Sequence, residues 1–451
     1  MPAVLRLPKE EIDTPEKREK FLLTVLGCEQ EAVSYALAFA EAGFKVICAS
    51  SDQSFVKKVS KGNLEFGNRQ SESKLRSFLR SEKISASADV KAAVSKSDII
   101  IITVNAKLDA NKTIDKTELE GNCRQVGAAL QKGSLLVYAG LAGFGSADNI
   151  IKDTLENASG LKAGEDFGFA YISPPNFITQ GLTRIGEEDL KIAANDKFSL
   201  NSAVLVFEAI AKKGLRKITS IKAAELAKLF SSARQDVDIA FANELAIFCE
   251  SANVDYVEIM KVLEVESCKK YVNPSIAEED NRKETYLLLE SAENFTAKLR
   301  LPTLARQINE DMVRHALNLT QDALRNCGKT LRRARVALLG DVESGEASAA
   351  LMEMLETKGA KISRYDPDPR ESEKSEGASS VKKTLIETVE AADCVVILSD
   401  LEPFKRLSLK KLHAVMRSPA ALIDLAGIIE PSKVQGEGFV YRGLGRGAWK
   451  K

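Results

Sequence analysis

Short apolar runs recur through the first part of the chain, and stretches with apolar residues at helical spacing separate them. The apolar runs predict strands over residues 21–26, 44–50, 98–104, 134–140 and 167–172. The intervening pattern predicts helices such as 33–42 and 89–96. Because strands and helices alternate, we expect a parallel sheet that is covered by helices on both faces.

The pattern changes near Gly214. Over residues 215–327 the sequence has no glycine, and only Pro274 and Pro302 interrupt apolar positions that repeat at helical spacing. This stretch predicts a helical domain in which residues 221–251 form one long helix.

The first pattern restarts at Arg333. An apolar run over 336–340 precedes a helical stretch that reaches Leu355, and Gly359 introduces a second run that ends at Tyr365. Further elements are predicted as strands over 394–398 and 420–424 and as an exposed loop over 372–380.

The predicted fold class is α/β, with two Rossmann-like parallel-sheet domains joined by a central helical domain that contains one long helix. The expected bounds are a polar leader at 1–20, an N-terminal domain at 21–214, a central domain at 215–328 and a C-terminal domain at 329–451. Each of these domains is long enough to form its own core.

The charge balance and the lengths of the apolar runs argue against nucleic-acid and membrane partners. Lys and Arg number 64 and Asp and Glu number 64, so no net charge attracts nucleic acid or an anionic membrane surface. No apolar run reaches the ~18 residues of a membrane span, and residues 1–20 are charged rather than signal-like. We therefore expect a cytoplasmic protein with no nucleic-acid or membrane partner.

Cysteine and histidine usage bears on metal and redox chemistry. The seven cysteines are scattered without a C-x-x-C pair, and His315 and His413 are the two histidines. These counts argue against a disulfide framework, a structural zinc site and a His-dependent triad. We predict no metal site.

The turn after the first predicted strand reads Gly27-Cys28-Glu29-Gln30-Glu31-Ala32. A dinucleotide-binding unit carries G-x-G-x-x-G there, because its middle glycine lets a pyrophosphate approach the backbone and the helix N-terminus. Glu29 opposes this approach, since two like charges about 4 Å apart near a protein surface repel by ~4 kcal/mol. The interpretation is a strand–helix turn without ligand, with a working NAD site as the alternative.

Four sequence strings are more specific than the fold. They occur in the order 36–46 (ALAFAEAGFKV), 220–229 (SIKAAELAKL) with 242–246 (ANELA), 365–367 (YDP) and 439–446 (FVYRGLGR). Together they resemble the UDP-glucose/GDP-mannose dehydrogenase family over residues 21–450. The resemblance implies oxidation of the C6 alcohol of a nucleotide sugar to a carboxylate in two NAD-dependent steps, through a cysteine-bound thiohemiacetal. It also implies a dimer built on the long central helix.

The resemblance places the cofactor contacts on Gly27 and Ala32 in the first turn and on Ser50 and Asp52 after the second strand. The ribose-binding acid of the family falls on Ser50, which offers one hydrogen bond where a carboxylate grips both ribose hydroxyls. Asp52 is the candidate substitute. Two other cofactor-side segments, a proline-threonine-proline turn and a glutamate-serine-threonine segment, fall on 105–107 (NAK) and 139–141 (AGL).

Among the catalytic positions that the resemblance assigns, one keeps the residue type of the family in this chain and others do not. Lys228 matches the lysine that stabilises the developing oxyanion, and the asparagine four residues later becomes Ser232. The alternative for Lys228 is a surface or dimer-interface cation. The catalytic glutamate falls on Pro175, which has no acid or base to offer.

The nucleophile has two alternative alignments. The family presents its cysteine in a glycine-rich loop, whereas no glycine or histidine occurs here between Tyr256 and Tyr286. One alignment places the cysteine on Glu279 and the other on Cys268, which Lys269 and Lys270 follow. Cys268 is therefore a candidate nucleophile or an ordinary cysteine at the end of a helix.

Two segments that bind the nucleotide sugar in the family also differ in this chain. The basic loop of the family aligns with the short acidic stretch 341–346 (DVESGE), and its aspartate-glycine-arginine segment aligns with 424–426 (DLA). Tyr441, Arg442 and Gly443 persist as candidate substrate-binding residues, for which packing is the alternative role.

Three functions compete. The first is a noncatalytic relative that serves as a scaffold, regulator or binding protein, as a homodimer or as a heterodimer with an intact paralogue. The second is an active NAD-dependent UDP- or GDP-sugar 6-dehydrogenase in polysaccharide precursor synthesis. The third is a different enzyme or binding protein on the same fold. We favour the first function, because loss of catalysis is then a single cause for every position at which this chain differs from the family motifs.

Overall fold

The computed structural model describes residues 7–64, 69–109, 112–174, 185, 187, 189–267, 271–276, 279–340, 346–367 and 381–447. The chain forms two compact units. The first contains residues 1–231 and 286–297, and the second contains residues 232–285 and 298–451.

The first unit contains an eight-stranded sheet in the order β10-β9-β8-β7-β4-β1-β2-β3. Its strands are β1 (Leu22–Leu26), β2 (Lys45–Ala49), β3 (Ile84–Ser87), β4 (Ile99–Ile102), β7 (Leu135–Tyr138), β8 (Gly168–Ile172), β9 (Leu190–Ala194) and β10 (Leu215–Lys217). All neighbouring strands are parallel except β8 and β9. The four isoleucines of β4 are fully buried, as expected for a central strand that is covered on both faces.

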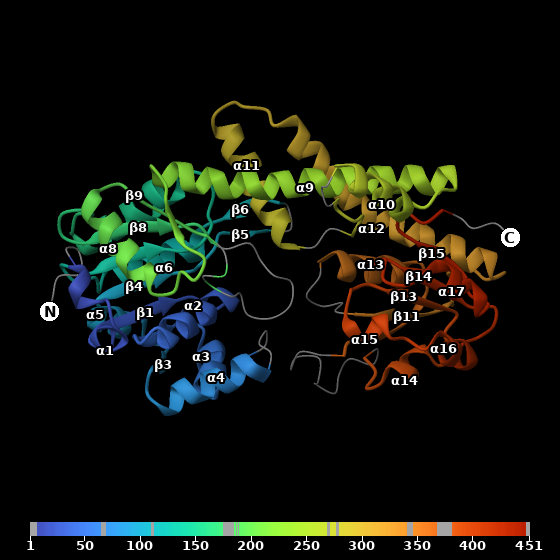
Figure 1. Cartoon of the computed structure of the whole chain (residues 1–451), viewed down its shortest axis with the longest axis horizontal. Coiled ribbons are helices and arrows are strands. Elements are labelled where there is room, and N and C mark those ends of the chain that lie inside the picture. The colour runs from blue at the N-terminus through green and yellow to red at the C-terminus, as the bar shows by residue number, and fades with distance from the viewer. Residues whose placement is uncertain are drawn as a thin grey trace. The chain divides into compact units, whose positions relative to one another are not determined.

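Helices alternate with these strands (Figure 1). They are η2 (Lys9–Glu11), α1 (Pro15–Arg18), α2 (Gln30–Glu41), α3 (Gln53–Ser60), α4 (Arg69–Arg80), α5 (Val90–Lys96), α6 (Thr117–Gly127), η3 (Ala147–Lys152), α7 (Asp153–Ser159) and α8 (Lys197–Glu208). A short hairpin joins β5 (Lys107–Leu108) and β6 (Ile114–Asp115). On one face of the sheet, Phe39 of α2 packs edge-on against Phe207 of α8 with 5.3 Å between ring centroids.

The described residues of the helical stretch form four helices: α9 (Ile221–Ala252), α10 (Tyr256–Ser267), α11 (Glu279–Asn294) and α12 (Arg300–Asn326). The predicted long helix is confirmed, since α9 has 32 residues without interruption. In the second unit, Asp236 of α9 forms a buried ion pair with Arg306 of α12 at 2.7 Å, and Asn309 donates to the same carboxylate oxygen at 2.6 Å.

The second unit contains a five-stranded parallel sheet in the order β12-β11-β13-β14-β15. Its strands are β11 (Arg335–Leu339), β12 (Lys361–Tyr365), β13 (Cys394–Ile397), β14 (Ala421–Asp424) and β15 (Val440–Gly443). Its helices are α13 (Glu346–Thr357), α14 (Leu385–Val389), α15 (Glu402–Lys405), α16 (Leu409–Val415) and α17 (Pro431–Gly436).

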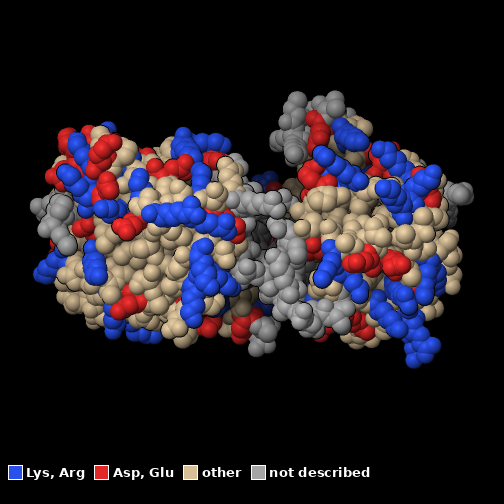
Figure 2. Space-filling model, turned by 90° about the horizontal axis from the view of Figure 1, so that it is seen from below, with Lys and Arg blue, Asp and Glu red and all other residues tan. Residues whose placement is uncertain are grey.

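The predicted fold class is confirmed: two Rossmann-like sheets and one long central helix are present. One detail differs from the prediction of a parallel sheet, because β8 and β9 run antiparallel. The loop predicted over 372–380 lies outside the described residues. On the face drawn in Figure 2, basic and acidic side chains are interspersed.

Candidate functional site

The carboxyl ends of β2, β1, β4 and β7 lie next to one another in the first sheet. Open parallel sheets bind ligands outside this edge where the strand order reverses, which here is between β1 and β4. Gly27 follows β1, and a Cβ atom added to it would lie 2.2 Å from Oγ1 of Thr103, which follows β4. The close approach of these two chain segments therefore requires glycine at position 27.

Glu29 caps the N-terminus of α2 with an extended backbone, but its side chain makes no capping hydrogen bond. Its Oε2 accepts a hydrogen bond from Asn105 Nδ2 at 3.2 Å. Asn105 Oδ1 in turn accepts from the Leu141 N–H at 2.8 Å. Asn105, in the loop after β4, thus joins the Glu29 carboxylate to the loop after β7.

The Glu29 carboxylate belongs to the end of α2 that favours anions and that receives the pyrophosphate in dinucleotide-binding units. Its neighbour Cys28 is half-buried, and burial raises the pKa of the Cys28 thiol to about 11, with Glu29 and Glu118 adding to the rise. The thiol is therefore protonated and a weak nucleophile. Ala32 is fully buried in the core.

Ser50 and Asp52 follow β2 and bond to each other and to α3. Ser50 is buried, and its Oγ accepts from the Asp52 N–H at 3.1 Å. Asp52 caps α3 by accepting from the Ser54 N–H at 2.8 Å. One oxygen of the predicted substitute for the ribose-binding acid is therefore already used by the protein backbone.

Lys228 and Ser232 stand one turn apart on α9, and both are buried. Ser232 donates its hydroxyl hydrogen to Glu284 Oε2 of α11, a carboxylate that is itself 6% exposed. Sequence reasoning missed Glu284. It lies 52 residues from Ser232, so no local spacing pattern could have linked the two.

Several predicted positions lie outside the described residues: Cys268, Pro175 and 341–345. Glu279, the alternative position for the nucleophile, is the first residue of α11.

Tyr441, Arg442 and Gly443 lie on β15. Arg442 Nε donates to Asp322 Oδ2 at 2.7 Å, and its NH1 donates to the Tyr441 carbonyl at 2.8 Å. A Cβ atom on Gly443 would lie 2.7 Å from the Tyr441 hydroxyl oxygen. These contacts are internal to the second unit.

The residues that follow β15 are bonded to the helices of the same unit. Gly445 donates its N–H to Glu250 Oε1 of α9 at 2.8 Å, and Arg446 NH1 donates to Asp255 Oδ2 at 2.7 Å. Burial raises the pKa of the Tyr441 hydroxyl well above its ordinary value, so this group stays protonated. The segment thus attaches the second sheet to α9 and α10.

Two further findings concern the described residues. Within them, no group of three or more His, Cys, Asp and Glu side chains is placed to hold a metal ion. Nor does any helix in that part of the chain have the length and apolar character that crossing a bilayer requires.

Models of one protein family match the chain in three consecutive segments. They are described as the NAD binding domain, the central domain and the UDP binding domain of the UDP-glucose/GDP-mannose dehydrogenase family, and they match residues 24–187, 222–311 and 346–431. The chain belongs to the UDP-glucose/GDP-mannose dehydrogenase family.

Individual relatives of this family match almost the whole chain. UDP-N-acetyl-D-mannosamine dehydrogenase from Pyrococcus horikoshii is 27% identical over 438 residues, which cover 94% of this chain and 99% of the relative. UDP-glucose 6-dehydrogenase from Rhizobium meliloti is 22% identical over 447 residues, covering 94% and 99%.

Solved structures agree. A structure of UDP-D-ManNAc dehydrogenase from Pyrococcus horikoshii has a TM-score of 0.84 at 25% identity and covers 95% of this chain and 100% of that one. A UDP-glucose dehydrogenase structure from Pyrobaculum islandicum shares the fold, with a TM-score of 0.79 at 21% identity and coverage of 95% and 98%.

These findings confirm the family predicted from the sequence. They also confirm NAD as the cofactor that family resemblance assigns to the first unit, because the matching model there is the NAD binding domain of the UDP-glucose/GDP-mannose dehydrogenase family.

Proposed function

We propose that this chain is a noncatalytic member of the UDP-glucose/GDP-mannose dehydrogenase family that serves as a scaffold, regulator or binding protein. The observation that carries the proposal is the Glu29 carboxylate, which stands at the N-terminus of α2 and accepts a hydrogen bond from Asn105. An anionic diphosphate that approaches this turn meets a negative charge where the family fingerprint has no side chain.

A second observation concerns the catalytic helix. The family uses a lysine and an asparagine to stabilise an oxyanion, and Ser232 stands at the asparagine position. Its hydroxyl is donated to Glu284, so this donor is directed at an internal carboxylate. The loss of one oxyanion donor typically lowers kcat by roughly 10²–10³, and the position of the catalytic glutamate is Pro175.

The competing function is an active NAD-dependent UDP- or GDP-sugar 6-dehydrogenase that uses Lys228, Ser232 and Cys268. The observation that favours it is the near-complete coverage of relatives whose names are those of dehydrogenases. Under this alternative, Tyr441, Arg442 and Gly443 contact the nucleotide sugar.

The deciding experiment measures NADH formation by the purified chain with NAD and a panel of UDP- and GDP-sugars. The dehydrogenase from Pyrococcus horikoshii is the positive control. We expect no NADH above the blank. Turnover near the usual enzymatic range of about 1 per second or faster, abolished by Cys268→Ala, would establish the competing function instead.

We also propose that α9 mediates pairing with a second copy of this chain or with an intact paralogue. Phe230, Phe241 and Phe248 of α9 are 56%, 60% and 69% exposed. Their spacing of eleven and seven residues places them on one helix face. Large exposed aromatic side chains along one face are typical of an interface.

The partner proposal is tested by light scattering on the purified chain. We expect a dimer, and we expect Phe241→Ser combined with Phe248→Ser to give a folded monomer. A wild-type chain that is monomeric at every concentration and does not co-purify with an intact paralogue would contradict it.

We also propose three domains with the bounds 21–214, 215–328 and 329–451, which follow a polar leader at 1–20. We expect a cytoplasmic location, with a nucleotide sugar as the candidate ligand and no nucleic-acid partner.

A further inference from the structure

Asn105 lies in the loop after β4 and contacts two other segments at the carboxyl edge of the first sheet. Its Oδ1 accepts from the Leu141 N–H at 2.8 Å, and its Nδ2 donates to Glu29 Oε2 at 3.2 Å. The neighbours determine the orientation of the amide, because a reversed amide would place its NH2 group against the Leu141 N–H and its oxygen against the carboxylate. The donor of Asn105 is therefore directed at Glu29.

The loops after β4 and β7 are closely paired around this contact. The Leu141 carbonyl accepts from the Ala106 N–H at 2.9 Å, and the Tyr138 hydroxyl donates to the Val104 carbonyl at 3.3 Å. A Cβ atom on Gly140 would lie 2.6 Å from the Val104 carbonyl oxygen, so the close approach of the two loops requires glycine there. The backbone that carries the amide is therefore held against the loop after β7.

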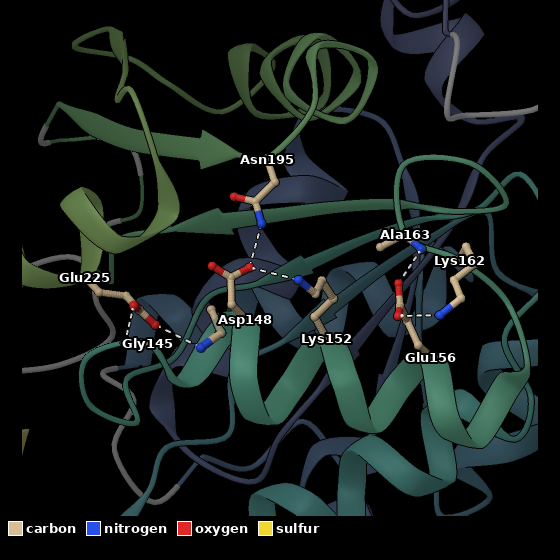
Figure 3. A network of polar contacts seen from close by, with 9 residues as sticks. Gly145, Asp148, Lys152, Glu156, Lys162, Ala163, Asn195 and Glu225 are labelled. Atoms are coloured by element: carbon tan, nitrogen blue, oxygen red, sulfur yellow. Dashed lines mark hydrogen bonds and ion pairs between the residues drawn. The ribbon is translucent and has the colours of Figure 1, made fainter. Parts of the chain in front are cut away.

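The continuation of the loop after β7, residues 142–147, is held by side chains of two helices. Glu225 of α9 is only 2% exposed, and it accepts from the Gly145 N–H at 2.7 Å and from the Ala147 N–H at 2.9 Å. Figure 3 shows the Glu225 carboxylate directed at this segment. Ser291 of α11 accepts from the Phe144 N–H at 3.1 Å. A side chain that is bonded to the loop after β7 is therefore bonded to a well-anchored segment.

Glu29 is exposed and has no such support from its own helix. It is the N-cap residue of α2, yet its side chain makes no capping hydrogen bond. The nearby cation Lys107 forms an ion pair with Glu118 of α6. A surface glutamate without a partner exchanges between rotamers and carries its charge into solvent. The hydrogen bond from Asn105 keeps the carboxylate at the amino end of α2.

We propose that Asn105 is a positioning residue that fixes the Glu29 carboxylate at the amino end of α2, so that the turn excludes a dinucleotide. The inference rests on the proposed function, in which Glu29 repels the diphosphate. The repulsion depends on position, because it weakens with distance and because water and salt screen a carboxylate that has turned into solvent. Asn105 thus acts through Glu29.

The test is a double-mutant cycle on the affinity for NAD, measured by ligand-observed NMR so that weak binding is covered. The four chains are wild type, Asn105→Ala, Glu29→Gly and the double variant. Asn105→Ala should lower the Kd for NAD about 3- to 10-fold in the chain that keeps Glu29, as expected for the loss of one hydrogen bond of ordinary strength. It should change the Kd of Glu29→Gly by less than about twofold, because no carboxylate remains to be positioned.

A purely structural role of Asn105 gives a different result, because damage to the loop alters NAD affinity alike in both backgrounds. The matched control is Asn326→Ala in the second unit. Asn326 Nδ2 also donates to a carboxylate, Asp322 Oδ2 at 3.3 Å, and its removal should leave NAD affinity unchanged. An equal effect of Asn105→Ala in both backgrounds, or no gain in the presence of Glu29, would overturn the inference.

Failure of the inference and failure of the proposed function give different patterns. A gain for Glu29→Gly without a gain for Asn105→Ala overturns the inference alone. No gain for Glu29→Gly removes the repulsion on which the inference rests and overturns it as well. A wild type that binds NAD with micromolar affinity and forms NADH overturns the proposed function, and the inference with it.

A second variant decides the question if Asn105→Ala does not fold. Asn105→Asp keeps an acceptor for the Leu141 N–H and replaces the donor that faces Glu29 by a like charge. A crystal structure of this variant should show the Leu141 contact retained and the Glu29 carboxylate turned away from residue 105. A Glu29 carboxylate that stays in place would overturn the inference.

Discussion

Replacement of Glu29 by glycine should allow NAD to bind at the turn between β1 and α2, where the glutamate now repels it. The substitution removes the carboxylate and restores glycine at the middle position of the fingerprint. The fold should tolerate it, because Glu29 makes no capping hydrogen bond and glycine is an acceptable N-cap residue. The substitution removes the favourable interaction of the charge with the dipole of α2, which is about 0.3–1 kcal/mol, and the hydrogen bond that Glu29 accepts from Asn105.

The magnitude follows from the position of the carboxylate. A phosphate bound at the N-terminus of α2 would lie about 4 Å from it, where two unit charges repel by ~4 kcal/mol near a protein surface. Removal of this repulsion corresponds to a Kd roughly 10³-fold lower for each close phosphate contact. We expect a smaller measured gain, at least about a hundredfold, because Ser50 still stands in place of the ribose-binding acid.

The assay is calorimetric titration of NAD into wild type, Glu29→Gly and Glu29→Gln. Glutamine keeps the size of the side chain but not its charge, so it separates repulsion from steric exclusion. Glu41→Gln is the control, because Glu41 lies at the other end of α2 and pairs with Lys74 at 3.2 Å on the surface. The reasoning is refuted if Glu29→Gly binds NAD no better than wild type, or if wild type already binds it with micromolar affinity.

Two stability predictions concern the second unit. Gly443→Ala should destabilise it by about 1–3 kcal/mol in urea unfolding, because the added Cβ would lie 2.7 Å from the Tyr441 hydroxyl oxygen. The control is Gly436→Ala, which should be neutral or slightly stabilising, because its added Cβ would have no atom within 4 Å. Arg306→Met should lower the free energy of unfolding by about 3–5 kcal/mol, because it leaves the 1% exposed Asp236 carboxylate without its ion pair. Adding Asp236→Leu should recover much of this loss. An unchanged urea midpoint for Arg306→Met would contradict the prediction.

The parts of the fold that could be predicted from the sequence have a strong local pattern. The four isoleucines of β4 and the uninterrupted helical spacing of α9 determine those elements directly. Strands β3, β9 and β10 were missed, and two of them, β3 and β10, lie at the edges of the sheet. The sequence of β10 is Leu-Arg-Lys, of which only the leucine is apolar, so no buried run marks the strand.

The candidate site also has a local part and a non-local part. The sequence shows directly that Glu29 stands where the fingerprint has its middle glycine. The hydrogen bond that Glu29 accepts comes from Asn105, 76 residues away, so the sequence does not show it. The Glu284 contact of Ser232 is equally non-local. A single sequence gives the residue types that differ from those of the family, whereas the groups that contact them depend on the fold.

Glu29 and Glu284 have a common physical effect. Each carboxylate accepts a hydrogen bond from a residue at a position that the resemblance assigns to the family site, Asn105 for Glu29 and Ser232 for Glu284. At Glu29 the charge itself opposes an incoming phosphate, because two like charges about 4 Å apart near a protein surface repel by ~4 kcal/mol. Removal of the Glu29 carboxylate should therefore restore NAD binding before it restores turnover. Because Pro175 supplies no acid or base, a variant that binds NAD tightly should still form no NADH.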